Sequence, residues 1–430
     1  MEIALIIPNA PFLAEPLSFP HLGILYISAS LKRAGYKPKV YDLTGGSKLP
    51  KISADIVGIT ATSPLFHSAI NIREAIRRYN QDAFFVIGGP HATVAPETCE
   101  EAGFDATISG EGEEAIVQIV RHFEVGWLDG IPPVTIANPI NPLDKLPYPD
   151  RDAIDMNKYH FYLYGKRLTN IQTQRGCSYG CAFCCGRDVQ CYRWARQRSV
   201  ENVRGEIQLL REKYGVEALM FFDDEFNLNK KHTLQMCRML KEEGIVWRAM
   251  IRSNFFDEEL AKAMAGAGCL ELGCGVETGS PTIKKNISKG TTIEQDFKAR
   301  ELCRKHGIKF KCFIVIGLPG ENYKTFNETR EWIGKAQPDN FDYTILMPYP
   351  GSPIWNHPEN YDINFDKKEI IASHFDDTFY KGELADGSIK SFVSTSALSR
   401  EEIVRLRMEL EKEFPRMIST PWSGTETKEN

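Results

Sequence analysis

The chain has 430 residues and a formal net charge of -5, with 42% hydrophobic and 25% charged residues. This length allows two or three domains, and the composition is that of a globular protein, which excludes a disordered, collagen-like or coiled-coil chain. The sequence has no run of 18 apolar residues, and no basic stretch precedes the apolar start MEIALIIPNAPF, so we expect neither a membrane span nor a signal peptide.

The first 125 residues alternate short apolar runs with amphipathic segments. We expect strands at 3–7, 38–43, 54–60, 83–89 and 104–110, and helices at 21–35, 65–79 and 113–123. Apolar strands that alternate with helices form a parallel sheet covered on both faces. Residues 1–130 are therefore predicted to form an open, doubly wound, Rossmann-like domain of five strands.

Open parallel sheets bind ligands outside the carboxyl ends of their strands. The turns expected there are Pro8–Ala10, Thr60–Pro64, Gly88–His91 and Ser109–Glu113. Small residues let the backbone approach a bulky ligand, although the same turns could serve only as tight connections. No G-x-G-x-x-G follows the first strand, which disfavours a dinucleotide.

Six prolines lie between residues 131 and 150, and they predict an extended linker, without helix or strand, over 131–165. Six further strand patterns then alternate with helix patterns, and they predict a partial (β/α)6 TIM barrel over 166–360 with its chemistry at the carboxyl ends of the strands. The strands are expected at 168–174, 218–224, 246–254, 270–277, 309–317 and 342–348. Residues 361–430 are expected to form a small C-terminal region, so that the whole chain belongs to the α/β class.

Eleven cysteines, an odd number, occur without an export signal, so we expect reduced thiols. Five of them fall within 15 residues: Cys177, Cys181, Cys184, Cys185 and Cys191. The first three form C-x3-C-x2-C, and three thiolates can hold three irons of a [4Fe-4S] cubane while the fourth iron stays open to a substrate or cofactor. A structural zinc site completed by Cys185 or Cys191 is the main alternative. Buried structural thiols are disfavoured by the polar, glycine-containing loop.

The cysteine motif, with Phe183 before its last cysteine and at the start of a six-stranded barrel, resembles the radical S-adenosylmethionine enzymes. The resemblance extends to the later strand ends FDDE (222–225), RSN (252–254), ETGS (277–280), FIVIGLPG (313–320) and MPYPGSP (347–353). It implies that the open iron binds the amino and carboxylate groups of S-adenosylmethionine. The residues that it assigns to S-adenosylmethionine are Phe183, Asp223, Asp224, Arg252, Ser253, Glu277, Ile316 and Gly317.

The doubly wound domain, the proline-rich linker and this barrel together resemble the cobalamin-binding branch of that family, the class B C-methylases. The matching segments are FPHLG (19–23), DIVGIT (55–60), GGPHAT (88–93) and GEGE (110–113). A D-x-H-x-x-G motif is absent, and the resemblance then implies that the protein supplies no histidine to cobalt. The lower face of cobalamin is expected to meet the loop 63–66, with Leu65 as the nearest side chain. The residues assigned to cobalamin are Pro8, Asn9, Thr60, Ser63, Leu65, Gly88, Gly89, His91, Gly110, Glu111 and Gly112.

The resemblance implies a C-methyltransferase that transfers a methyl group from methylcobalamin to a radical on an unactivated carbon. It names no catalytic residue. Tyr343, Tyr349 and Trp355, at or just past the last strand, are candidates for substrate contact, with ordinary packing as the competing explanation. A peptide or protein substrate is expected, with glutamine in methyl-coenzyme M reductase as the specific lead.

Two other functions stay open: a cobalamin-dependent radical cyclase or rearrangement enzyme that does not transfer methyl, and a zinc-binding structural module. A radical enzyme acting on RNA is disfavoured by the charge balance, because nucleic-acid binders carry clustered Lys and Arg. The expected partner is a one-electron donor such as ferredoxin or flavodoxin, with no nucleic acid and no membrane. A cluster with an open iron is destroyed by oxygen, so we expect a cytoplasmic, anaerobic or reducing environment.

Overall fold

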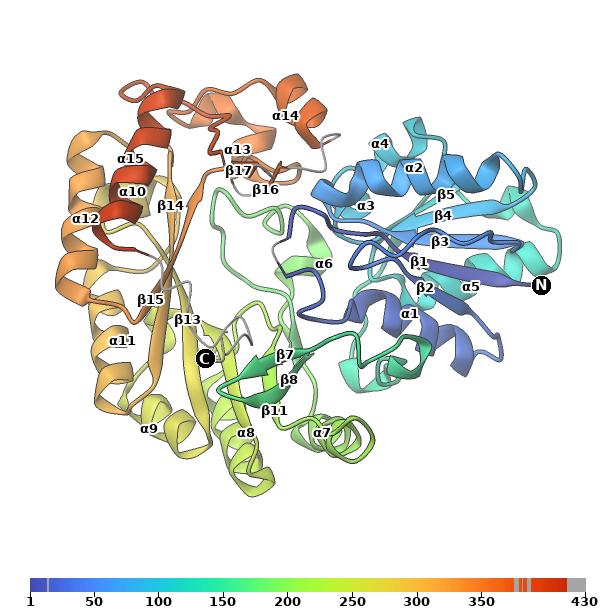
Figure 1. The fold of residues 1–430 in the computed structure, drawn as a ribbon, viewed down its shortest axis with the longest axis horizontal. Helices are drawn as coiled ribbons and strands as arrows, with labels where there is room; N and C mark the ends of the chain where they lie inside the picture. Colours follow the sequence, from blue (N-terminus) through green and yellow to red (C-terminus); the bar gives the residue numbers. More distant parts are fainter. Residues whose placement is uncertain (14, 375–378, 381, 385–387, 416–430) are drawn as a thin grey trace, which may run out of the picture.

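The computed structural model describes residues 1–13, 15–374, 379, 380, 382–384 and 388–415. Each half of the chain is built on one sheet, as Figure 1 shows. The first sheet is parallel and has the order β2-β1-β3-β4-β5-β6. Its strands are β1 (Ile3–Ile7), β2 (Lys39–Asp42), β3 (Ile56–Thr60), β4 (Phe84–Gly88), β5 (Ala106–Gly110) and β6 (Val134–Ala137).

Helices cover both faces of this sheet because successive residues of each strand point to opposite sides. Ile3, Leu5 and Ile7 pack with α1 (Leu22–Arg33) and α5 (Gly112–Glu124). On the opposite face, Ala4 and Ile6 share a core cluster with residues of the remaining helices. These are α2 (Phe66–Arg77), α3 (Pro90–Val94) and α4 (Pro96–Glu101). The doubly wound prediction is confirmed.

The prediction of five strands in this sheet, and of a linker without strands, is wrong. Residues 134–137 form β6, which pairs in parallel with β5 at the sheet edge. An edge strand needs hydrogen bonds on one side only, so the flanking prolines do not prevent pairing. The linker also supplies β7 (Phe161–Leu163), which forms an antiparallel hairpin with the first barrel strand. The proposed boundaries at residues 130 and 165 fall outside β5 and β8. The segment between them, however, adds β6 to the first sheet and β7 to the second.

The second sheet has the order β15-β14-β13-β12-β11-β8-β7 and is parallel except for the β7–β8 hairpin. It confirms the six parallel strands of a partial barrel. Its parallel strands are β8 (Lys166–Ile171), β11 (Ala218–Phe221), β12 (Val246–Ile251), β13 (Cys269–Glu277), β14 (Lys309–Ile316) and β15 (Asn340–Ile345). The helices on its convex side are α7 (Val200–Tyr214), α8 (Lys230–Glu243), α9 (Glu258–Gly266), α11 (Ile293–Lys305) and α12 (Tyr323–Ala336).

Local signals in the sequence set the limits of these barrel helices. Ser199 caps α7 by accepting a hydrogen bond from the Asn202 amide, and Gly215 ends that helix in the left-handed conformation. Short elements follow the last strands, and the C-terminal helix α15 packs near β15 and β14 (Figure 1). These elements are α10 (Pro281–Asn286), α13 (Pro353–Asn356), α14 (Lys367–His374), β16 (Phe379–Tyr380), β17 (Glu383–Leu384) and α15 (Arg400–Glu413).

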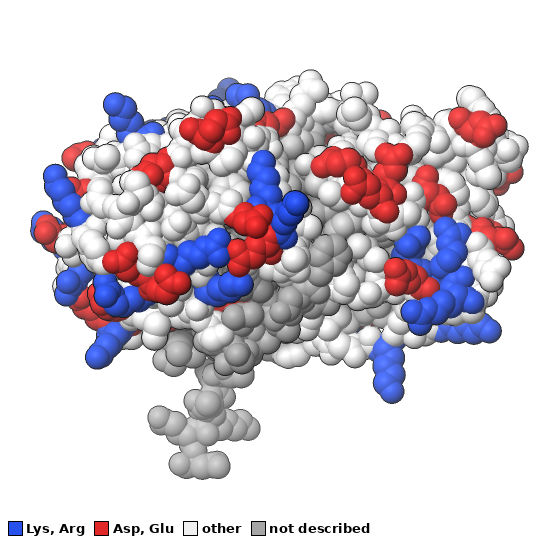
Figure 2. All heavy atoms as spheres, turned by 90° about the horizontal axis from the view of Figure 1, so that it is seen from above, with Lys and Arg blue, Asp and Glu red and all other residues white. Residues whose placement is uncertain are grey.

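The face of the molecule seen in Figure 2 carries charges of both signs. Figure 2 shows acidic and basic side chains on the same face, and neither sign covers it. Within the described ranges, no helix is long and apolar enough to cross a membrane.

Candidate functional site

The cysteine loop follows β8 and is closed at its base by a two-stranded ladder. β9 (Gln174–Arg175) pairs with β10 (Arg196–Gln197), and the loop between them carries the short helix α6 (Gln190–Arg193). The Cys177 amide donates to the Tyr192 carbonyl over 2.7 Å. Gly176 has a φ of 91°, and a Cβ there would lie 2.4 Å from the Trp194 carbonyl oxygen. Glycine is therefore required where the loop begins.

The thiols of the C-x3-C-x2-C motif are neighbours in space. Burial raises the pKa of the Cys184 thiol to about 12, with further contributions from the thiols of Cys185, Cys181 and Cys177. Among the described residues, no group of three or more His, Cys, Asp or Glu side chains could hold a single metal ion. A cubane takes one thiolate at each of three irons, so its ligands need not converge on one point. The loop therefore fits a cubane.

Arg252 lies behind this loop with hydrogen-bonding capacity that the protein does not use. It is 2% exposed, stacks on Tyr179 at 3.6 Å from the ring centroid, and places Nη1 3.9 Å from the Cys181 sulfur. Its Nε and Nη2 are buried without a partner, as is Oδ1 of Asn254. Buried donors normally have acceptors, and a guanidinium pairs well with a carboxylate. These atoms fit the aminocarboxylate end of S-adenosylmethionine.

Two aspartates follow β11, and each binds backbone amides at the base of the cysteine loop. Asp223 accepts the Thr173 and Gln174 amides at 2.6 and 2.9 Å, and burial raises its pKa to about 6 despite these bonds. Asp224 accepts the Gly176 amide at 2.8 Å. Both side chains therefore hold the entrance to the cysteine loop, which is a different role from the one that the sequence suggested.

Glu225 is better placed to meet a ligand's ammonium group than either aspartate. Its carboxylate lies 4.0 Å from Arg252. Burial raises the pKa of Glu225 to about 7, although the charges of Lys289 and Arg252 oppose that rise. A buried carboxylate beside an open ligand position suits an ammonium partner. Glu225 is therefore a further candidate for the ammonium contact, and the assignment of Asp223 and Asp224 to S-adenosylmethionine stays a prediction.

Glu277 and Ser253 are already engaged by neighbouring side chains. Glu277 ends β13 with a φ of 64° and accepts from the buried Lys289 ammonium at 2.8 Å. Ser253 donates to Asp296 at 2.6 Å. The Phe183 ring centroid lies 6.0 Å from the same Lys289 ammonium. The structure thus places Phe183 and Glu277 together beside Lys289, and leaves their contact with S-adenosylmethionine as a prediction.

Ile316 and Gly317 end β14 beneath the C-terminal region. Ile316 is 1% exposed. Gly317 has a φ of 82°, and a Cβ there would lie 3.2 Å from Val393 and 3.3 Å from Ile403. The C-terminal region therefore limits the space at this strand end to the size of a glycine, and any ligand contact here would be through the backbone.

The carboxyl edge of the first sheet brings the predicted cobalamin loops together. A Cβ on Gly89 would lie 2.8 Å from Thr60 Oγ1, and one on Gly110 would lie 2.6 Å from the Ala137 carbonyl oxygen. Both glycines have positive φ values, 99° and 109°. Glycine is therefore required at both turns because neighbouring atoms of the domain occupy the position of a Cβ. Contact of these turns with cobalamin stays a prediction.

The side chains assigned to cobalamin are mostly bonded within the first domain. His91 is hydrogen-bonded through Nδ1 to Ser63 at 3.0 Å and through Nε2 to Thr98 at 2.9 Å. Asn9 accepts the Gly46 amide at 3.0 Å, and Leu65 is 4% exposed within the core. The absence of a histidine on cobalt, and Leu65 as its nearest side chain, stay predictions. Pro8, Gly88 and Gly112 lie at the same edge, at the ends of β1 and β4 and at the start of α5.

The substrate candidates do not form one group. Tyr343 is 1% exposed and donates to the Phe414 carbonyl at 3.0 Å, so it packs behind the barrel wall rather than at the mouth. Tyr349 and Trp355 both pack against a small cluster formed by Met347, Ile370 and Phe392. The hydroxyl of Tyr343 is directed to the end of α15, which agrees with ordinary packing, and its contact with substrate stays a prediction.

Sequence reasoning missed four side chains that organise the site. Lys289 and Tyr179 bracket Arg252 and Glu277, and Arg175 and Arg196 flank the cysteine loop. The one local signal for Arg196 is the basic stretch from Arg193 to Arg198, which by itself indicates no partner. Lys289 pairs with Glu277, which lies twelve positions earlier at the end of β13. No spacing pattern in the sequence predicts this pair.

Comparisons with known proteins agree with this geometry. Residues 16–120 match the model of the B12 binding domain, and residues 171–333 match that of the radical SAM superfamily. The chain is 33% identical over 384 residues to an uncharacterized methyltransferase of Pyrococcus horikoshii, covering 83% of each chain. It is 26% identical to an anaerobic magnesium-protoporphyrin IX monomethyl ester cyclase of Rubrivivax gelatinosus, covering 87% of this chain and 73% of the relative.

A solved structure shares the fold of nearly the whole chain. It is a radical S-adenosylmethionine methyltransferase from Kitasatospora setae with cobalamin and a [4Fe-4S] cluster bound. The likeness has a TM-score of 0.75 at 18% identity and covers 95% of this chain and 91% of that one. The arrangement of the two sheets is thus that of a protein that holds both cofactors.

Proposed function

The chain belongs to the cobalamin-dependent radical S-adenosylmethionine enzymes of the methyltransferase type, and we propose that it methylates an unactivated carbon of its substrate. Members of this family use a [4Fe-4S] cluster, S-adenosylmethionine and cobalamin. When bound, the cluster and S-adenosylmethionine supply a radical that takes hydrogen from the substrate, and cobalamin supplies the methyl group. The protein's own residues bind and orient these groups.

The observation that carries the proposal is the direct contact between the cysteine loop and the carboxyl edge of the first sheet. A Cβ on Gly351 would lie 2.8 Å from the Val94 Cβ and 3.1 Å from the Cys185 carbonyl oxygen. Tyr192 of the cysteine loop bonds to Thr93 of α3. The loop that would hold the cluster therefore lies against the edge that would hold cobalamin, which supports the proposal that both cofactors serve one substrate carbon.

We assign the following roles to the residues of the barrel mouth. Cys177, Cys181 and Cys184 hold the cluster. Arg252 and Glu225 bind the carboxylate and the ammonium of S-adenosylmethionine, because buried unpartnered donors and a buried carboxylate face that position.

The substrate class is the least determined part of the proposal. A glutamine in a peptide or protein, as in methyl-coenzyme M reductase, is the substrate that we propose to test first. The Rubrivivax relative acts, by its name, on a magnesium porphyrin ester, which is a small molecule. Small-molecule substrates therefore belong in the same screen.

The same relative gives a reason to test a second function, cyclisation without methyl transfer. The two functions differ in how they consume S-adenosylmethionine. A methylase forms S-adenosylhomocysteine when cobalamin is recharged and 5′-deoxyadenosine when the radical forms, whereas a non-methylating enzyme forms only the second product.

The test begins with iron, sulfide and cobalt content and a visible spectrum of protein purified without oxygen and supplied with cobalamin. We expect about four irons and one cobalt per chain. Incubation with S-adenosylmethionine, a reductant and candidate peptides should then yield S-adenosylhomocysteine, 5′-deoxyadenosine and a peptide heavier by one methyl group. 5′-Deoxyadenosine without S-adenosylhomocysteine would favour the cyclase. Iron without cobalt would refute methyl transfer through cobalamin.

A further inference from the structure

We propose that Arg175 and Arg196, at the two ends of the cysteine loop, position the cluster relative to cobalamin by pairing with Glu113 and Glu111 of the first domain. These four side chains are called the interdomain lock below. The inference rests on the proposed function only in supposing that both cofactors bind to the chain.

The lock begins where the cysteine loop closes. Arg175 and Arg196 are direct partners in the β9–β10 ladder, so one arginine stands at the start of the loop and the other at its end. Glu111 and Glu113 lie in the turn between β5 and α5 and in the first turn of α5. That turn is one of the predicted cobalamin loops. The lock therefore joins the two loops that would carry the two cofactors.

The contacts are short, bidentate and buried. Arg196 approaches both oxygens of Glu111, with Nη2 at 2.6 Å from one and Nη1 at 2.8 Å from the other. Arg175 Nη2 lies 2.6 Å from Glu113, and its Nη1 lies 3.5 Å from Glu111. The Arg196 side chain is 2% exposed and the Glu113 side chain 5%. A bidentate guanidinium fixes orientation as well as distance.

The charged forms of these groups are favoured in the folded protein. Burial opposes charge on Glu111, but the hydrogen bond from Arg196 and the charge of Arg175 bring its pKa below the ordinary value. Removing one partner leaves a buried charge alone, which is costly. The lock therefore resists partial opening.

The opposite side of the loop base is held by the barrel. Asp223 accepts the Thr173 and Gln174 amides, and Asp224 accepts the Gly176 amide. Arg175 lies between these anchored amides, and its side chain points the other way, over the Tyr26 ring of α1 at 5.0 Å. The loop base is thus clamped between carboxylates of the barrel and carboxylates of the first domain.

Such a clamp matters because two cofactors must reach one substrate carbon. A misplacement of about 1 Å far from the reacting atoms can lower a rate about a hundredfold. Arg175 and Arg196 are thus positioning residues: they touch neither substrate nor cofactor in this assignment, and act by setting the distance between two loops.

The test compares the Glu113→Gln and Arg175→Gln variants and their double variant with wild type in the holoenzyme. Two readouts are used: the dipolar coupling between the reduced cluster and Co(II), and hydrogen exchange in residues 110–114 and 174–177. We expect wild-type iron and cobalt contents, a broader cluster–cobalt distance distribution, and exchange at least tenfold faster in both segments. The double variant should resemble the single ones, because each change opens the same contact.

Arg300→Gln is the matched control, since Arg300 is buried and pairs with Asp339 at 3.4 Å wholly within the barrel. It should leave both readouts as in wild type. Unchanged coupling and exchange in the Glu113→Gln and Arg175→Gln variants would overturn the lock. If a variant does not fold, Arg175→Lys, which keeps the charge and removes the fork, should show an intermediate effect. A wild-type protein that binds iron but no cobalt would refute the proposed function. Hydrogen exchange in the variants would in that case still test the interdomain lock.

Discussion

At the scale of single residues, unsatisfied polar atoms locate the ligand position within the barrel mouth. Arg252 keeps Nε and Nη2 buried without a partner, and Asn254 keeps Oδ1 in the same state. Inside a protein such atoms are costly unless a ligand pairs with them. By contrast Asp223 and Asp224, at the end of β11, each accept backbone amides at the base of the cysteine loop.

Arg252→Lys should weaken the binding of S-adenosylmethionine to the iron-loaded protein about tenfold to a hundredfold, because a charge-assisted hydrogen bond contributes about 1.5–3 kcal/mol. Equilibrium binding measures this change. Arg300→Lys, at a buried arginine away from the mouth, is the control and should bind as wild type does. Equal affinity in Arg252→Lys and wild type would remove Arg252 from the binding site.

Cys177→Ser, Cys181→Ser and Cys184→Ser should each lose most of the roughly four irons expected in wild type, because each thiolate holds one iron of the cubane. Cys185→Ser and Cys191→Ser should keep iron, which makes them matched controls in the same loop. Iron and sulfide analysis of anaerobically reconstituted proteins gives the answer. Loss of iron in Cys185→Ser with retention in Cys184→Ser would change the assigned ligand set.

At the scale of elements, the ends of the barrel strands are set by buried carboxylates that bind backbone amides. Glu321, which is 1% exposed, accepts the Gly317 amide and so shapes the turn after β14. Burial raises the pKa of Glu321 to about 7, although the hydrogen bonds from Gly317 and Leu318 oppose this rise. The turn therefore carries a titratable group with a folded pKa above the unfolded value of about 4.3.

Because the pKa of Glu321 is raised in the folded protein, its protonated form stabilises the fold. This stabilisation is complete below a pH of about 4.3 and is lost as pH rises through about 7. The unfolding free energy of wild type relative to Glu321→Gln should therefore fall with rising pH in this window, by up to about 1.4 kcal/mol per pH unit. Denaturant unfolding of both proteins at several pH values measures the difference. Glu331→Gln, at an exposed position on α12, should show no such trend. A difference that does not vary with pH would contradict the shift.

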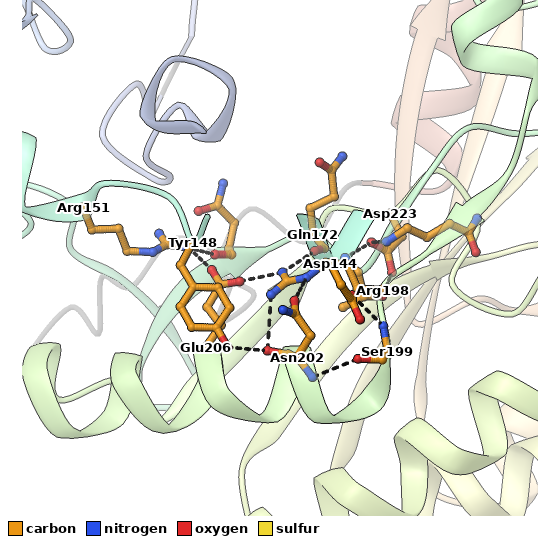
Figure 3. A network of polar contacts seen from close by, with 12 residues as sticks. Asp144, Tyr148, Arg151, Gln172, Arg198, Ser199, Asn202, Glu206 and Asp223 are labelled. Carbon is orange, nitrogen blue, oxygen red and sulfur yellow. Dashed lines mark hydrogen bonds and ion pairs between the residues drawn. The ribbon is translucent and has the colours of Figure 1, made fainter. Parts of the chain in front are cut away.

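At the scale of the whole molecule, a second buried network ties the linker to the barrel, and Figure 3 shows its members converging on α7. Glu206 lies 3.3 Å from Arg151 of the linker and 2.5 Å from Arg198 after β10. The Glu206 side chain is 1% exposed. Tyr148 of the linker also donates to the Asn202 carbonyl at 2.9 Å. The linker is thus fixed to α7 through Tyr148 and Arg151.

Glu206→Gln should lower the free energy of unfolding by about 3–5 kcal/mol, because it leaves two buried guanidinium groups without their carboxylate. Denaturant unfolding monitored by circular dichroism measures this loss. Glu242→Gln removes the exposed partner of Arg204 and should cost less than about 1 kcal/mol. Equal stabilities of the two variants would show that the linker network is not a major source of stability.

Much of this molecule could be predicted from local patterns. The strand Ile3–Ile7, the cap at Ser199 and the left-handed Gly215 follow from apolar runs and turn chemistry. The cysteine spacing likewise depends on neighbours along the chain. The edge strand β6 was missed because prolines surround it and its pairing depends on β5, which lies more than twenty residues earlier.

The sequence by itself determined the fold class, the order of the two sheets and the cysteine triad, because each is encoded by spacing along the chain. The cofactor set followed from the resemblance of its motifs to a known family. Only the tertiary structure decided how those parts are used. It assigned Asp223 and Asp224 to the loop base, turned Tyr343 towards α15, and brought Arg175 and Arg196 onto Glu113 and Glu111. These contacts join residues up to 85 positions apart, and pairing at that separation depends on how the sheets pack rather than on any local pattern.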